Sequence, residues 1–235
     1  NLSQAKVHLN DANQSLKDIE SQSEANLASV YESGLNVVKN SYLEVYNTLQ
    51  NVDLIQRTYF IKNDQQGVKM REAEDRIKKA SNKASFYLNR TQADYKYENV
   101  DAALSQMKES LIEIDNNLKI IRDLCDESVY RSLIPLADKN LLDTERASIN
   151  AALTNVINSQ QAISQTKLSN QYNIDKGRTA VNQAKAGVIS AEGALASAKA
   201  ELERITANPR KEDIDLYQIQ IREAETNIKL LESKI

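Results

Sequence analysis

Hydrophobic residues recur at alternating spacings of three and four in the second half of the chain. The positions run without interruption through Ile174, Gly177, Val181, Ala184, Val188, Ala191, Leu195, Ala198, Leu202 and Ile205. An apolar repeat of 3.5 residues, held over more than four heptads, is typical of a coiled-coil helix. Its alanines favour close approach of a partner helix. We call this stripe the seam, and expect a long helical arm here.

The seam is interrupted near residues 206–213, and a second stripe follows. The residues that define this break are Asn208, Pro209, Arg210, Glu212, Asp213 and Ile214. Asn208 is a favourable N-cap, Pro209 fits a first helical position, and acidic residues suit the positive N-terminal end of a helix dipole. The second stripe comprises Ile214, Tyr217, Ile221, Ala224, Ile228, Leu231 and Ile235. The pattern indicates a register break inside one arm.

The N-terminal residues carry a similar pattern. A first stripe comprises Leu2, Ala5, Leu9, Ala12, Leu16 and Ile19, and polar residues 21–24 shift its phase before it resumes at Leu27. Each phase change lies about twenty residues from one end of the sequence. A phase shift in one arm must be matched in its partner if the interface is to stay dry. We therefore expect residues 1–22 and 213–235 to be antiparallel partners.

Two shorter helical patterns lie between the arms, near residues 68–95 and 100–125. Loops of the observed length join antiparallel neighbours. We therefore predict an all-α fold, a long antiparallel coiled-coil hairpin with a distal three- or four-helix bundle. Its parts are an outgoing arm over 1–60, inserted helices of the distal bundle over 61–138, and a return arm over 139–235 with the break near 206–213.

Composition supports long helices and narrows the possible partners. Only 5 Gly and 2 Pro occur in 235 residues, so few turns are available, and 27% of the residues are charged. The net charge is -3 and basic residues are scattered, which disfavours nucleic acid as a partner. No stretch approaches the ~20 apolar residues of a membrane span. Because the sequence begins at Asn1, we expect it to be a segment of a longer protein.

Candidate chemistry is sparse. His8 is the one histidine and lacks a nearby His or Cys, so we interpret it as a solvated side chain. Cys125 continues the apolar stripe of Val100 to Ile121, which favours a small core residue over a nucleophile. We expect no enzymatic activity, no cofactor and no metal. The tyrosines of the middle region favour bundle packing, with a binding surface as the alternative.

The segment Leu202–Ile214 resembles the second hairpin helix of HlyD-type membrane fusion proteins, also called periplasmic adaptor proteins. That family has an Ala-rich helix, a short break and a final helix rich in Ala, Gln and Glu. The residues that match the family's break are Arg210, Glu212, Asp213 and Ile214, while Asn208-Pro209 stands where the family usually has glycine. The resemblance covers about residues 174–235, and extends more weakly to 1–22. Residues 60–173 look like an insertion.

The resemblance implies a structural adaptor of an envelope efflux or secretion transporter, on the extracytoplasmic side and anchored by parts outside this sequence. It implies two partners, a membrane transporter of ABC or RND type and other copies of the same protein. Family members that dock TolC-like channels carry Arg, Leu and Ser at a fixed spacing, and neither Arg122 nor Arg131 begins such a motif. The alternative is a ligand-sensing helical-bundle ectodomain of a membrane receptor, whose termini also exit together.

Overall fold

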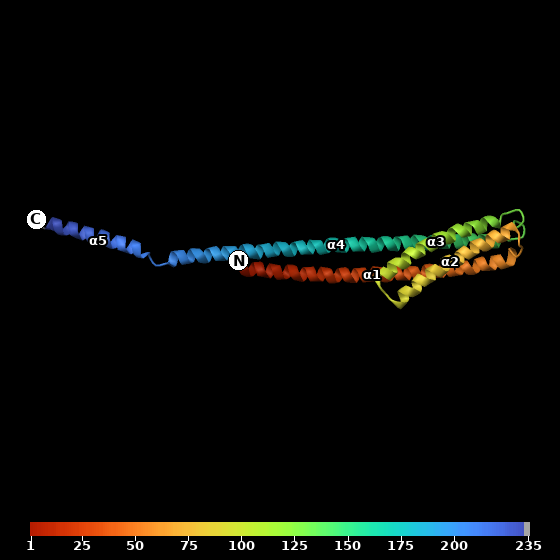
Figure 1. Ribbon diagram of the computed structural model, residues 1–235, viewed down its shortest axis with the longest axis horizontal. Coiled ribbons are helices and arrows are strands. Elements are labelled where there is room, and N and C mark those ends of the chain that lie inside the picture. Colours follow the sequence, from red (N-terminus) through yellow and green to blue (C-terminus); the bar gives the residue numbers. More distant parts are fainter. Residues whose placement is uncertain (233–235) are drawn as a thin grey trace. The chain divides into compact units, whose positions relative to one another are not determined.

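The computed structural model describes residues 1–232 and shows five α-helices (Figure 1). They are α1 (Leu2–Tyr59), α2 (Gln65–Ala93), α3 (Tyr97–Leu124), α4 (Leu136–Thr206) and α5 (Lys211–Glu232). About 90% of the chain is helical, and no strand occurs among the described residues. The prediction of an all-α fold is confirmed.

The chain divides into two compact units. The larger unit is Leu16–Gly177, which holds most of α1, all of α2 and α3, and the first part of α4. The smaller unit joins Asn1–Ser15 to the chain from Arg178 onward.

Helices α1 to α4 share one hydrophobic core in the larger unit. Its largest fully buried side chains are Tyr31, Ile55, Phe60, Met70, Ile77, Leu104, Met107, Leu111, Ile114, Leu118, Ile121 and Tyr130. Those of α3 recur at spacings of three and four, as one apolar helix face does, and α4 adds Leu142, Ile149 and Val156 to the same core. α2 and α3 lie along each other (Figure 1), and Ser110 Oγ on α3 donates a 3.0 Å hydrogen bond to the Ala80 carbonyl on α2.

α1 and α4 run antiparallel in this unit, because residues late in α1 meet residues early in α4. Near the end of α1, the Tyr59 hydroxyl donates to an Asp138 carboxylate oxygen at 2.5 Å. Much earlier in α1, the Ser23 carbonyl oxygen accepts a 2.7 Å hydrogen bond from Asn170 Nδ2 of α4. The contact therefore follows both helices over more than thirty residues.

The two turns at one end of this unit pack on each other. Asp64 caps α2 by accepting a hydrogen bond from the Gly67 amide at 2.7 Å, and its other carboxylate oxygen accepts one from the Tyr130 hydroxyl at 2.7 Å. The Tyr130 ring also stacks on Phe60, with centroids 4.3 Å apart. One aspartate and one aromatic pair thus join the α1–α2 turn to the α3–α4 loop.

In the smaller unit, the start of α1 packs with the middle of α4. Leu2, Ala5, Leu9 and Ala12 are the half-buried positions of the first fifteen residues, and Val181 on α4 is only 5% exposed. From residue 192 to 232 every described residue is exposed. The predicted stripes are therefore covered only in part.

The predicted pairing of residues 1–22 with 213–235 is wrong. α5 has no buried residue, whereas a Cβ placed on Gly177 of α4 would lie 2.9 Å from Leu16 Cδ1 and 3.3 Å from Ile19 Cδ1 of α1. These two α1 residues therefore face the middle of α4. The physical reason is that α4 changes phase within its own length and so matches α1 there. Ile235, the last position of the second predicted stripe, lies outside the described residues.

Candidate functional site

A buried carboxylate joins α1 to α4 in the larger unit. Thr48 Oγ1 donates to Glu145 Oε2 at 2.6 Å, and Asn51 Nδ2 donates to Glu145 Oε1 at 2.7 Å. Glu145 is only 8% exposed. A carboxylate removed from water is costly unless its oxygens are hydrogen-bonded. Sliding α1 by one turn would leave this carboxylate without partners, so the trio selects one register.

Apolar periodicity does not reveal these polar contacts, because it depends on apolar residues alone. Ser23, Ser41 and Thr48 occupy buried positions on the same stripe of α1 as Val38, Val45 and Val52. Their signal in the sequence is the spacing, since each falls three or four residues from an apolar neighbour. Thr48 bonds across the interface through its side chain, and Ser23 accepts a hydrogen bond from α4 through its backbone carbonyl oxygen.

The predicted seam residues divide into two groups. Gly177 and Val181 are buried and four others are half-buried, namely Ile174, Ala184, Val188 and Ala191. The remaining four are exposed, namely Leu195, Ala198, Leu202 and Ile205. The structure thus covers the seam as far as Ala191 and leaves its continuation open to solvent.

The residues of the predicted break lie between α4 and α5. α4 ends at Thr206 and α5 begins at Lys211. The Arg210 carbonyl accepts the first backbone hydrogen bonds of α5, from Asp213 N at 3.0 Å and Ile214 N at 3.1 Å. Arg210 therefore precedes the helix where Asn208 was expected, and Pro209 lies outside it. Glu212 and Asp213 occupy the first turn, where the helix dipole favours carboxylates.

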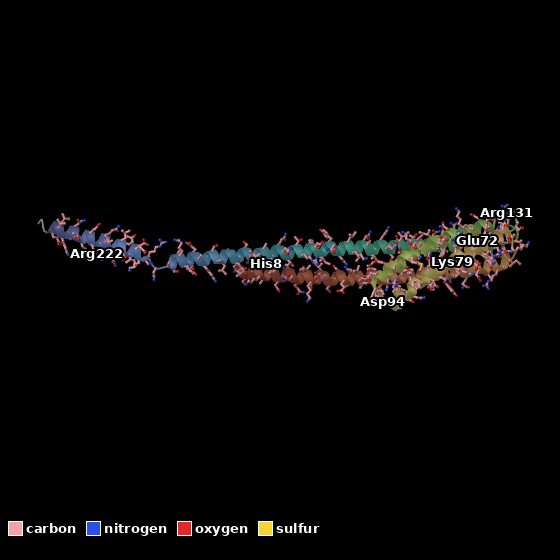
Figure 2. The ribbon with its side chains drawn as sticks, viewed as in Figure 1. His8, Glu72, Lys79, Asp94, Arg131 and Arg222 are labelled. Carbon is pink, nitrogen blue, oxygen red and sulfur yellow. The ribbon has the colours of Figure 1, made fainter. Side chains whose placement is uncertain are left out.

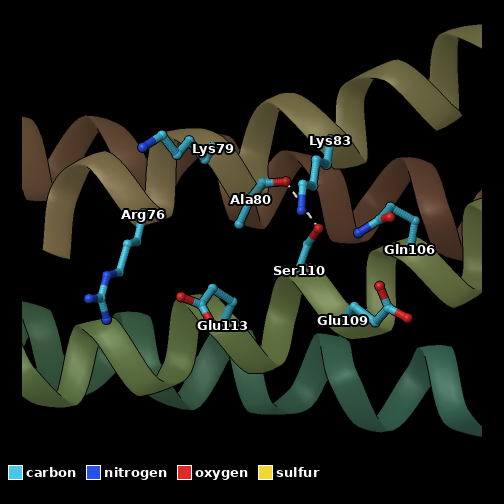
Figure 3. Close-up of a pocket in the computed structure, with 8 residues that line it drawn as sticks. All are labelled: Arg76, Lys79, Ala80, Lys83, Gln106, Glu109, Ser110 and Glu113. Carbon is cyan, nitrogen blue, oxygen red and sulfur yellow. Dashed lines mark hydrogen bonds between the residues drawn. The ribbon is translucent and has the colours of Figure 1, made fainter. Parts of the chain in front are cut away.

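A groove of about 310 Å³ lies between α2 and α3. Figure 3 shows that its two walls differ in charge. The α2 wall carries Arg76, Lys79 and Lys83, and the α3 wall carries Glu109 and Glu113. The hydrogen bond from Ser110 to the Ala80 carbonyl closes its floor (Figure 3). A groove with cations on one side and carboxylates on the other suits a zwitterionic ligand or a charged peptide.

Tyrosines cluster where α1 meets the start of α3. The rings of Tyr31 and Tyr97 stack with centroids 4.1 Å apart, and Tyr95 packs edge-on against Tyr97 at 6.3 Å. The Tyr31 hydroxyl donates to Asp101 at 2.8 Å, and Lys167 Nζ lies 5.2 Å from the Tyr31 ring centroid. Burial raises the pKa of Tyr31. This cluster ties α1, α3 and α4 together.

The loop after α3 is held by a small ionic network. Asp126 receives hydrogen bonds from Lys139 Nζ at 2.8 Å and from Arg122 at 2.5 Å. These two cations lower the pKa of Asp126 to about 2. Lys139 is only 7% exposed and also donates to the Arg131 carbonyl at 3.1 Å. The network closes the loop onto the first turn of α4.

The two residues with intrinsic reactivity, His8 and Cys125, lie far apart in the sequence and in different surroundings. His8 is exposed on α1, and Cys125 is fully buried in the core. Burial raises the pKa of the Cys125 thiol to about 11, so the reactive thiolate is scarce at neutral pH. Among residues 1–232 no three His, Cys, Asp or Glu side chains are grouped as metal ligands would be. Side chains with nitrogen and oxygen atoms project along the helices (Figure 2), and charged residues occur in every helix.

No protein family, no characterised protein and no solved structure matches this chain. Within the described residues, none of the helices combines the length and the apolar character that a bilayer span requires.

Proposed function

We propose that this chain is the helical hairpin of an envelope adaptor similar to the HlyD-type membrane fusion proteins. In this proposal α1 and α4 form an antiparallel coiled-coil hairpin, and α2 and α3 complete a distal four-helix bundle. The observation that supports it most is the α1–α4 contact from Ser23–Asn170 to Tyr59–Asp138. At 1.5 Å per residue this interface is about 50 Å long. A long rigid rod suits a spacer.

The proposed role is mechanical and non-enzymatic. The hairpin would hold components of an efflux or secretion transporter at a fixed spacing and bridge them. Its register would be set by Glu145 with Thr48 and Asn51, because a spacer transmits position only if its helices do not slide. The proposed partners are a transporter of ABC or RND type and other copies of the protein. The proposed site of action is the extracytoplasmic side of the cell envelope, with anchoring by parts outside this sequence.

The test uses photo-crosslinking in cells that express the protein at its native level. A photoreactive amino acid replaces Leu43 on α1 or Leu168 on α4, which are 58% and 70% exposed. The adaptor role predicts crosslinks to subunits of a membrane transporter and to other copies of the protein. Buried Val45, on the same helix as Leu43, is the matched control and should crosslink only within the chain. Crosslinks from Leu43 and Leu168 that contain no transporter subunit would refute the proposal.

A second candidate function is ligand sensing by the four-helix region, as in a receptor ectodomain. The groove between α2 and α3 favours it, because cationic and anionic walls face each other across about 310 Å³. Thermal unfolding in the presence of amino acids and other small zwitterions tests this function. A sensor should show saturable stabilisation that Lys83→Glu and Glu113→Gln each reduce. An adaptor hairpin should show none, and the melting temperature should stay constant across the panel.

A further inference from the structure

α5 carries an apolar stripe that no other part of the described chain covers. The stripe comprises Ile214, Tyr217, Ile221, Ile228 and Leu231, whose exposed fractions lie between 43% and 65%. The equivalent stripe in the middle of α4 behaves differently, since Val181 is only 5% exposed. Both stripes repeat every three or four residues, which is the spacing that packs against another helix. α5 therefore has the pattern of an interface and lacks a partner helix over it.

We propose that two copies of this chain associate through α5, with the two α5 helices antiparallel across a two-fold axis. A two-fold axis between Ile221 and Ala224 brings the stripe of each copy onto the stripe of the other. Ile214 then lies opposite Leu231 of the partner copy, Tyr217 opposite Ile228, and Ile221 opposite Ala224. Every layer pairs two apolar residues, and the central layers pair a large with a small side chain.

Charges beside the stripe favour this antiparallel register. Lys211 and Glu232 flank the stripe at opposite ends of α5. In the antiparallel pair, Lys211 of one copy therefore lies opposite Glu232 of the other copy. Because the axis is two-fold, this ion pair occurs twice in the dimer. The next flanking positions place Gln218 opposite Glu225 and Gln220 opposite Asn227, so these described positions bring no like charges together. A parallel pair would face Gln220 with Glu225 and Asn227 with Glu232, without an opposite-charge pair.

The surface available suits a reversible dimer. If each stripe residue buries about 100 Å² of its side chain, the five bury about 1,000 Å² over both copies, the lower limit for a specific interface. Antiparallel helix dipoles add a favourable term, because each positive N-terminus meets a negative C-terminus. We therefore expect a dimer that forms at micromolar concentration and dissociates on dilution. This association requires no transporter, so it stands or falls separately from the adaptor role.

Sedimentation velocity of residues 1–235 across a concentration series tests the proposal. The unmodified chain should shift from monomer to dimer as concentration rises. Ile221→Asp should raise the dissociation constant at least tenfold, because it places a carboxylate in the central layer. Ile219→Asp is the matched control, since Ile219 is 52% exposed on the opposite side of α5, and it should leave the dimer intact. A monomer at all concentrations, or equal effects of the two variants, would overturn the proposal.

An exchange of charges between two positions distinguishes a variant that weakens the dimer interface from one that unfolds α5. Lys211→Glu alone should weaken the dimer, because the introduced carboxylate would then face the carboxylate of Glu232 in the partner copy. The double variant Lys211→Glu with Glu232→Lys restores opposite charges and should regain the original dissociation constant. Circular dichroism should show equal helix content in both variants. If the double variant is no tighter than Lys211→Glu, the antiparallel register is wrong.

Discussion

Nδ2 of Asn170 donates a 2.7 Å hydrogen bond to the backbone carbonyl oxygen of Ser23, 147 positions earlier in the chain. Both residues are buried, with exposed fractions of 8% and 7%. Each also lies where its helix changes phase. In α1 the inward positions step from Ile19 to Ser23 to Leu27, two consecutive spacings of four.

α4 makes the same change at the same level. Its inward positions step from Thr166 to Asn170 to Ile174, again two spacings of four. An extra four-residue step locally unwinds a coiled coil, and two helices stay in contact only if both make it together. The rule that phase shifts match between partners therefore applies here. The phase change at Ser23 of α1 is matched by the one at Asn170 of α4, and not by the break at 206–213.

Removal of the Asn170 side chain should destabilise the larger unit. Asn170→Ala should lower its free energy of unfolding by about 1–2 kcal/mol, because a buried hydrogen bond and its packing are lost. Asn170→Asp should cost more, since a buried carboxylate would face the Ser23 carbonyl oxygen without a donor. Urea denaturation followed by circular dichroism measures both. Gln171→Ala, at an exposed neighbouring position, should change stability by less than about 0.5 kcal/mol, and an equal cost there would contradict the assignment.

Two glycine substitutions should have opposite effects. A Cβ on Gly67 would lie 2.2 Å from the Lys62 carbonyl oxygen, which is backbone and has little freedom to move. Gly67→Ala should therefore destabilise the α1–α2 turn by about 2 kcal/mol or more. A Cβ on Gly187 of α4 would meet no atom within 4 Å, so Gly187→Ala should stabilise its helix by about 1 kcal/mol. Melting temperatures of the two variants test this, and shifts of the same sign would refute it.

Asp126 should make stability depend on pH in the acidic range. Lys139 and Arg122 lower its pKa from 3.8 to about 2. Its ion pairs therefore stabilise the fold above the ordinary pKa, and this contribution is lost as pH falls through about 2. Asp126→Asn should be less stable than the unmodified protein at neutral pH. This difference in stability should shrink as pH falls from 3.8, the ordinary pKa of the carboxyl group, to about 2, its pKa in the folded protein. Melting temperature against pH measures it. A difference that is constant with pH would exclude this carboxylate as the cause.

Cys125 should be unreactive in the folded protein. Its side chain is fully buried, and burial raises the pKa of its thiol to about 11. Both effects suppress the thiolate that attacks alkylating reagents. Iodoacetamide at mildly alkaline pH should label Cys125 only after denaturant is added, as mass spectrometry would show. Ser197→Cys supplies an exposed thiol in the same protein and should be labelled at once. Comparable labelling of both cysteines without denaturant would mean that the loop after α3 opens readily.

Apolar spacing was enough to predict the helices, because an amphipathic helix repeats its apolar positions at every turn. The Val100 to Cys125 stripe corresponds closely to the buried face of α3, whose helix spans Tyr97–Leu124. Pairing between helices was harder to predict, because many stripes share the same spacing. The seam from Ile174 to Ile205 looks uniform in the sequence, yet only its first part is covered. Burial of the seam depends on which helix lies opposite it. Polar positions such as Asn170 specify that pairing.

The candidate sites could not be predicted from the apolar pattern for a related reason. The groove between α2 and α3 depends on which sides of two helices remain outside the core, so Lys83 and Glu113 come to line the same groove only after packing. Glu145 resembles a solvated residue in the sequence, because charged residues are common on exposed helix faces. Its burial follows from its position on the inward stripe between Leu142 and Ile149. A search for charged residues at inward spacing would have found it.

The boundary between the covered and open parts of the seam gives the final prediction. Val181 is 5% exposed and Leu202 is 61% exposed, although both occupy the same stripe of α4. Val181→Asp buries a carboxylate without a partner and should weaken the packing of residues 1–15 on α4 by several kcal/mol. Leu202→Asp leaves its carboxylate in water and should cost little. Amide hydrogen exchange at Ala5 to Ala12, whose amides follow the first backbone hydrogen bond of α1, measures the local opening. Val181→Asp should speed exchange there by at least tenfold, Leu202→Asp should leave it unchanged, and equal acceleration by both would mean that the seam is covered along its whole length.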